Sequence, residues 1–195
     1  MWRAVPKVVV MISLFFIAGA ASQLGDRIDL ERVLRDPAAM NALVILYKPN
    51  MEDSLYVYGN GRVVFQSHAV QMSDELVPTC KGKLQLSQVR ELVEAIHEHH
   101  FFDLPQRSYY FMTASDDADD FWKALKLHTI VLDDGETRAQ RSFAEGMYQG
   151  VREPIPPDFA AIEVLLQKIR SDDIGGACHI APGIKLPELS PRVVR

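Results

Sequence analysis

Apolar and polar residues follow two periods along this chain, one typical of strands and one typical of helices. Between Ser54 and Gln66, the run SLYVY alternates with period two, and VVF follows after a short polar break. Asn60-Gly61 in that break supplies the positive φ angles of a tight type I′ turn. The same period returns in residues 124–143, with Asp134-Gly135 at the turn. These two stretches predict two β-hairpins.

A helical period separates and follows the hairpins. Leu86–Phe101 is apolar at positions i, i+3, i+4 and i+7, and Ser87 is placed to cap its N-terminus. The aromatic residues that close this segment are predicted to enter the core. Asp158–Arg170 shows a second apolar stripe and begins directly after Pro157. The sequence therefore predicts two amphipathic helices.

Two shorter elements precede the first hairpin. Asp29–Arg35 suits a short helix that Asp29 caps and Pro37 ends. Ala42–Tyr47 is an unbroken apolar run of strand length, which predicts a buried strand.

These elements predict an α+β fold in two layers. Two hairpins and a buried strand form an antiparallel sheet with one apolar face, and the two amphipathic helices cover that face. We place this single domain at residues 22–174. Residues 175–195 contain glycine and several prolines and are predicted to be an extended C-terminal tail.

Residues 1–21 have the layout of a secretory signal peptide. Arg3 and Lys7 precede an apolar run, and the small residues Ala18 and Ala20 satisfy the cleavage rule. The alternative is a retained membrane anchor, but the uncharged run from residue 8 to residue 21 is shorter than the about 20 residues that span a bilayer. The sequence thus predicts an exported protein, periplasmic or secreted, with no membrane span after cleavage.

Composition and charge narrow the function classes once this segment is removed. The 195-residue chain is 48% hydrophobic and 24% charged, which is typical of a globular protein and not of a disordered one. The signal segment carries two basic residues and no acidic one, so the net charge of −5 becomes −7 for the remaining 174 residues. An acidic chain of this kind is not expected to bind nucleic acid, because binding requires a basic surface.

Export changes the expected chemical state of the two cysteines, Cys80 and Cys178. In an oxidising compartment such a pair favours a disulfide, and only one pairing exists. The bond would close a loop of about 98 residues and stabilise the fold by a few kcal/mol. Two free thiols or a link between chains remain as alternatives.

One stretch resembles a known type of domain. Its pattern is an aromatic strand, a Gly-Asn-Gly turn and a valine-rich return strand, followed by Leu-Ser and Leu-Val in a helix that ends in Phe-Phe-x-Leu. Residues 56–104 in this way resemble an exported bacterial domain of unknown function. Similar domains often carry cysteines just before the first hairpin, where this chain has Lys48-Pro49-Asn50-Met51. These are turn and core motifs, so the resemblance implies a fold and brings no catalytic residues.

Two groups of residues are weak candidates for metal binding. His97 and His100 lie three residues apart near the end of the first long helix, so both imidazoles fall near one face. Polar and cationic groups are also favoured there by the helix dipole alone. The second group is an acidic run that suits calcium by its carboxylates but lacks the glycine and distal glutamate of a calcium loop. That run contains Asp116, Asp117, Asp119 and Asp120.

Several aromatic residues also have the parity of an exposed surface. Tyr56 and Tyr58 lie on one side of their strand, and Tyr109–Phe111 follow the first long helix. Such residues line binding surfaces, although they more often pack across strands.

The sequence contains no nucleotide-binding glycine loop and no nucleophile elbow, so no cofactor is expected. The favoured hypothesis is therefore a non-catalytic exported domain that binds a protein or an envelope component. The alternative is a hydrolase or metal-dependent enzyme that joins a histidine to the acidic run. The ligand and the oligomeric state stay open at this point.

Overall fold

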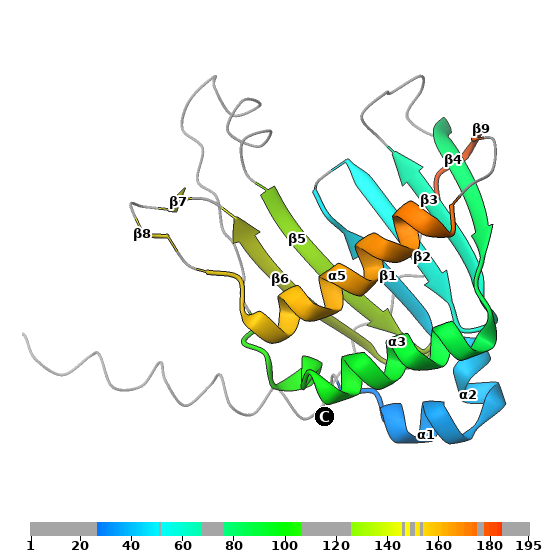
Figure 1. Cartoon of the computed structure of the whole chain (residues 1–195), viewed down its shortest axis with the longest axis horizontal. Coiled ribbons are helices and arrows are strands. Elements are labelled where there is room, and N and C mark those ends of the chain that lie inside the picture. The colour runs from blue at the N-terminus through cyan, green and yellow to red at the C-terminus, as the bar shows by residue number, and fades with distance from the viewer. Residues whose placement is uncertain are drawn as a thin grey trace, which may run out of the picture.

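The computed structural model describes residues 27–50, 52–67, 76–106, 126–145, 147–148, 151–152, 154–174 and 178–184. The predicted signal peptide and the acidic run lie outside these residues. The described part of the chain is drawn in colour in Figure 1.

Two short helices open the described chain. Helix α1 (Leu30–Arg35) begins where the Asp29 carboxylate accepts a hydrogen bond of 2.9 Å from the backbone N–H of Arg32. Helix α2 (Pro37–Ala42) begins in the same way at Asp36. The predicted first helix and its cap are therefore confirmed.

Seven strands form one sheet in which every neighbouring pair is antiparallel. Their spatial order is β6-β5-β1-β2-β3-β4-β9. A separate short ladder joins β7 (Met147–Tyr148) and β8 (Val151–Arg152). The strands of the large sheet are β1 (Val44–Lys48), β2 (Asp53–Tyr58), β3 (Arg62–Ser67), β4 (Leu76–Lys83), β5 (Lys126–Asp133), β6 (Arg138–Glu145) and β9 (His179–Pro182).

The sheet confirms the α+β prediction and is larger than predicted. Both predicted hairpins, β2–β3 and β5–β6, and the buried strand β1 are present. The sequence did not reveal β4 or β9, which add two strands beyond β3. Strand β9 lies within the segment predicted to be the C-terminal tail.

The turn between β2 and β3 differs from the predicted type I′ turn. Among residues 59–61, only Gly61 has a positive φ, of 85°, and its N–H donates to the Tyr58 carbonyl. This is the pattern of a three-residue loop, in which a type I turn precedes a glycine bulge. The Asn60 side chain accepts from the N–H of Arg62, so Asn60 acts through its amide and not through a left-handed backbone.

Two long helices cover one face of the sheet, as Figure 1 shows. Helix α3 (Leu86–Glu98) begins after Gln85, whose N–H donates to the Gln88 side chain, so the predicted cap at Ser87 is wrong. The short helix η1 (Phe101–Asp103) follows it, and α5 (Pro157–Asp172) lies beside it.

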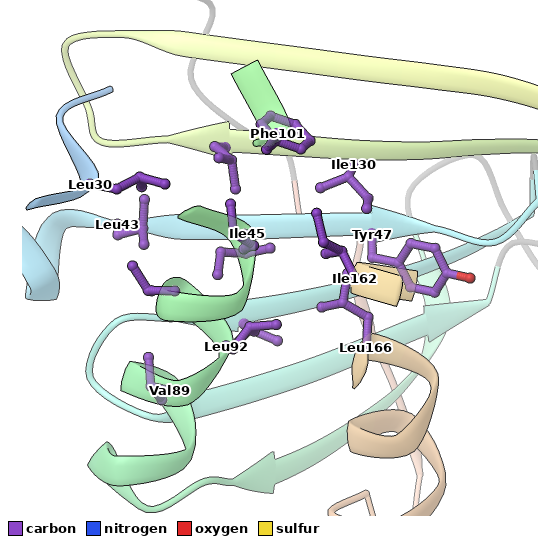
Figure 2. Packing of buried hydrophobic residues seen from close by; sticks show 14 of the residues in the cluster. Leu30, Leu43, Ile45, Tyr47, Val89, Leu92, Phe101, Ile130, Ile162 and Leu166 are labelled. Carbon is purple, nitrogen blue, oxygen red and sulfur yellow. The ribbon is translucent and has the colours of Figure 1, made fainter. Parts of the chain in front are cut away.

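The main core lies between these helices and the sheet. Figure 2 shows Ile45 and Tyr47 of β1 among side chains of both helices, including Leu92 of α3 and Ile162 of α5. Phe101 is fully buried there, which confirms that the end of the first long helix enters the core. Burying apolar side chains on this scale is the main stabilising term of such a fold.

The opposite face of the sheet is also buried, although one apolar face was predicted. Leu46, Tyr56, Val64 and Val131 form a second cluster there, and each is at most 9% exposed. Within the described part of the chain, Ile184 also packs against this cluster after β9. Because both faces of the sheet bury side chains, the central strands carry apolar residues on both sides.

A disulfide joins Cys80 on β4 to Cys178, the residue before β9. The predicted pairing is confirmed, and a disulfide of this kind is compatible with an oxidising compartment. None of the described helices has the length and apolar character needed to cross a bilayer.

Candidate functional site: an extended segment held on the sheet

The last described residues lie along the edge of the sheet as an extended segment. We call residues 178–184 the C-terminal strap. The strap pairs with β4 from Leu76↔Pro182 to Thr79↔His179, and the disulfide at Cys178 fixes its first residue beside Cys80. Beyond Pro182 it passes from the edge onto the second face, where Ile184 packs.

Gln66 of β3 holds the strap through two backbone atoms. Its side-chain Nε2 donates to the Pro182 carbonyl at 3.2 Å, and its Oε1 accepts from the Ile184 N–H at 2.8 Å. The second hydrogen of Nε2 is directed to the Thr79 hydroxyl at 3.0 Å. Gln66 is completely buried, so its amide must find these partners within the protein.

Tyr56 of β2 completes the grip on Ile184. Its hydroxyl donates to the Ile184 carbonyl at 3.0 Å, so side chains of the sheet hold both the N–H and the carbonyl of one residue. Burial raises the pKa of Tyr56, and the neighbouring Tyr58 adds to the rise, so the hydroxyl stays a donor at neutral pH.

At the end of β4 beyond the disulfide, the strand approaches helix α5 closely. Gly82 lies against the end of α5, where a β-carbon would stand 2.2 Å from the Asp173 carbonyl oxygen. Glycine is therefore needed at this position for a close backbone approach. The strap thus occupies a site bounded by β4, by Gln66 and Tyr56, and by the end of α5.

The arrangement recognises an extended backbone more than particular side chains. Ile180 remains 48% exposed, and His179 and Pro182 are also exposed. Main-chain pairing at a sheet edge with side-chain pockets at selected positions is a recurring mode of peptide recognition.

A second polar group lies beneath α5, where it joins the helix to the sheet. Glu163 Oε1 accepts from the Tyr47 hydroxyl at 2.8 Å and lies 2.5 Å from His128 Nδ1. Gln167 donates to the same Tyr47 hydroxyl at 3.1 Å. Burial raises the pKa of Tyr47, which keeps its hydroxyl a donor.

This buried polar group was not predicted, although the sequence carries a signal for it. Glu163 lies four residues after Phe159 and three before Leu166, and so within the apolar stripe of α5. A carboxylate in such a stripe must be paired. With His128 9% and Glu163 6% exposed, the group acts as a buried contact between helix and sheet.

The histidines at the end of α3 occupy two different settings. His97 and His100 both line a hollow of about 340 Å³ between α1 and the region of η1. His99 instead pairs with Asp158 at the start of α5, at 3.1 Å. Over the described ranges, no three or more metal-binding side chains come together. Asp116, Asp117, Asp119 and Asp120 lie outside those ranges, so the predicted acidic group is not placed.

The predicted aromatic surface takes a different form. Tyr56 is 5% exposed and lies in the second core cluster, and Tyr58 packs against that cluster. Tyr109–Phe111 lie outside the described residues. The expected exposed parity is wrong for Tyr56, because the sheet buries apolar residues on both faces.

Comparisons with models of protein families, with curated proteins and with solved structures found no match. Any function proposed for the chain therefore depends on the geometry of the strap and of the buried polar group.

Proposed function

We propose that this chain is an exported, non-catalytic domain that binds a partner protein or envelope component. The observation that carries the proposal is the pair of hydrogen bonds that Gln66 and Tyr56 make to the backbone of Ile184. Because these bonds go to main-chain atoms, they support the view that the sheet binds extended polypeptide.

The location of the buried pair His128 and Glu163 supports the same proposal. His128 and Glu163 are buried against one another and Tyr47 beneath α5. A catalytic acid or base must reach a substrate, and this pair lies between a helix and a sheet. These residues thus favour a stabilising role over a catalytic one.

Export is part of the proposal and has its own test. The basic start, apolar run and small residues of segment 1–21 support it, and the Cys80–Cys178 disulfide is compatible with it. Mass spectrometry of the protein recovered from outside the cytoplasm is expected to show a chain that begins at residue 22. A full-length chain in the cytoplasmic fraction would contradict export.

Partner binding is tested by cross-linking in the native envelope. The exported chain, with an affinity tag placed after residue 22, is treated with an amine cross-linker in intact cells and then captured. We expect one partner in near-stoichiometric yield that an unrelated tagged exported protein does not capture. If the chain is recovered without any partner beyond that control, a binding role is wrong.

A further inference from the structure

We propose that the β4 edge, with Gln66 and Tyr56, is a binding site for an extended segment of a partner polypeptide, which takes the place of residues 179–184. This inference rests on the proposed function and names the surface and the kind of partner. The strap in this structure shows what the site accepts.

The first reason is that the hydrogen bonds of the site address backbone atoms. Gln66 bonds to the Pro182 carbonyl and the Ile184 N–H, and Tyr56 bonds to the Ile184 carbonyl. Any extended segment presents the same N–H and carbonyl groups at these positions. The strap therefore has no advantage over another segment in these three contacts.

The second reason is that few strap side chains are buried. Ile180 is 48% exposed and His179 and Pro182 are exposed, so most of the ladder buries little apolar surface. The side chain that packs against the second core cluster is that of Ile184. A strand at the edge of a sheet with so little burial opens more readily than the strands inside it.

The third reason is that an empty site is unfavourable. Without the strap, the Gln66 amide keeps its bond to Thr79 among the described residues, and the Tyr56 hydroxyl loses its acceptor. Water must then replace the backbone of Pro182 and Ile184, and the apolar surface that the Ile184 side chain covers becomes exposed. A partner segment restores these bonds and covers this surface, so the site favours replacement of the strap over simple opening.

These contacts define the partner. It is an extended segment with a branched apolar side chain at the position of Ile184 and a free N–H there, so proline is excluded at that position. The positions of His179 and Ile180 tolerate variation because their side chains reach solvent. One apolar anchor with a main-chain ladder is typical of strand addition.

A second copy of this chain is the less favoured occupant. In each copy, the disulfide joins Cys178 to its own Cys80, which keeps the strap on its own sheet. An exchange between two copies requires both disulfides to open. A partner segment needs to displace only residues 179–184, which follow the disulfide. The disulfide also keeps the strap at high local concentration, so it weakens every competitor.

The test measures binding of a labelled peptide with the sequence of residues 178–184, with serine at the Cys178 position, by fluorescence anisotropy. The proteins are the oxidised full chain and its Cys80→Ser/Cys178→Ser variant, with folding verified by circular dichroism. We expect saturable binding that is at least about tenfold tighter for the serine variant. A peptide with an N-methyl group at the Ile184 position loses the donor to Gln66 and should bind about three- to tenfold more weakly.

A matched pair of variants separates the site from general packing. Tyr56→Phe removes the hydroxyl that bonds to Ile184, whereas Tyr58→Phe changes a neighbour in the same cluster. Tyr56→Phe weakens the strap and a peptide of the same sequence alike, so the readout for this pair is how readily the strap opens. Hydrogen exchange of the Ile184 amide should speed up about three- to tenfold in Tyr56→Phe and stay within twofold in Tyr58→Phe. Equal exchange in wild type and both variants, or equal binding of the N-methylated peptide, would overturn the proposal.

Hydrogen exchange on the oxidised wild-type chain keeps the proposal testable if the serine variant does not fold. Added peptide should speed exchange of the protein's own Ile184 amide and leave the amides of α3 unchanged. Unchanged exchange of Ile184 at saturating peptide would refute displacement of the strap. A serine variant that is a stable dimer and binds no peptide would assign the site to a second copy instead.

The two proposals fail in different ways. If cross-linking captures a partner equally well with wild type and with Tyr56→Phe, and the peptide does not bind, the partner uses another surface and only this inference is wrong. If no partner is captured although the peptide binds, the site is real and the proposed function is wrong.

Discussion

Replacing Glu163 by alanine tests how α5 is held on the sheet. Glu163 accepts a hydrogen bond of 2.8 Å from the Tyr47 hydroxyl and lies 2.5 Å from His128 Nδ1, and all three residues are buried. Alanine leaves both neighbours without this acceptor inside the protein. Removing one partner of a buried charged group typically costs about 3–5 kcal/mol, which is a large part of the stability of a domain.

Urea unfolding at pH 7, followed by far-UV circular dichroism, measures this loss. We expect the free energy of unfolding to fall by about 3–5 kcal/mol for Glu163→Ala. Glu163→Gln retains one acceptor oxygen, and its loss should be smaller, about 1–2 kcal/mol.

The neighbouring residue provides the control for this measurement. Val164→Ala on the exposed side of the same helix should change the free energy of unfolding by less than about 0.5 kcal/mol. A loss below about 1 kcal/mol for Glu163→Ala would refute the view that this group joins helix to sheet.

Three further predictions concern the disulfide, the buried tyrosines and the close approach at Gly82. Without reductant, the denatured protein should not be alkylated, and after reduction its mass should rise by two alkyl groups; serine at both cysteines should lower the free energy of unfolding by about 2–5 kcal/mol. Burial raises the pKa of Tyr47 and Tyr56 in the folded protein above the value near 10 of an unfolded chain. The free energy of unfolding should therefore be unaffected by these groups below about pH 10 and should fall above it, by up to about 1.4 kcal/mol per pH unit for each tyrosine. Urea unfolding from pH 8 to 11 should show this decline, and Tyr47→Phe should make it less steep. Gly82→Ala places a β-carbon 2.2 Å from the Asp173 carbonyl and should lower the midpoint of thermal unfolding, through a loss of about 1–3 kcal/mol, whereas Gly135→Ala meets no atom within 4 Å and differs only in its backbone strain at φ 85°.

The hairpins and the long helices were predictable because their signals are local. A two- or 3.6-residue period extends over each element, and Gly61 marks the first turn by a backbone angle that glycine favours. The type of that turn was wrong, because Asn60-Gly61 serves a three-residue loop as well as a two-residue one. The cap of α3 was also wrong, because Gln85 and not Ser87 precedes the helix.

Strands β4 and β9 were not predictable because non-local contacts make them strands. The sequence LVPTCKGK of β4 mixes proline, glycine and two lysines, and its pairing with β3 on one side and β9 on the other determines its structure. Tertiary context often overrides strand propensity in this way.

The candidate site has no signature in the sequence for a related reason. Gln66 contacts backbone atoms 116 and 118 residues away, and backbone atoms are the same in every residue. An alternating strand makes Gln66 look like a solvent-facing residue. Glu163 differs, because a carboxylate within the apolar stripe of α5 indicates a buried partner from the sequence pattern alone.

The location of cross-links to the captured partner tests binding at the β4 edge most directly. Lys81 and Lys83 of β4 and Lys168 of α5 are all exposed. An amine cross-linker therefore has handles on the strand that pairs with the strap and another on a helix that packs on the other face of the sheet. Partner binding at the strap predicts that cross-links from the native envelope concentrate on Lys81 and Lys83. Cross-links that concentrate on Lys168 and spare β4 would contradict it.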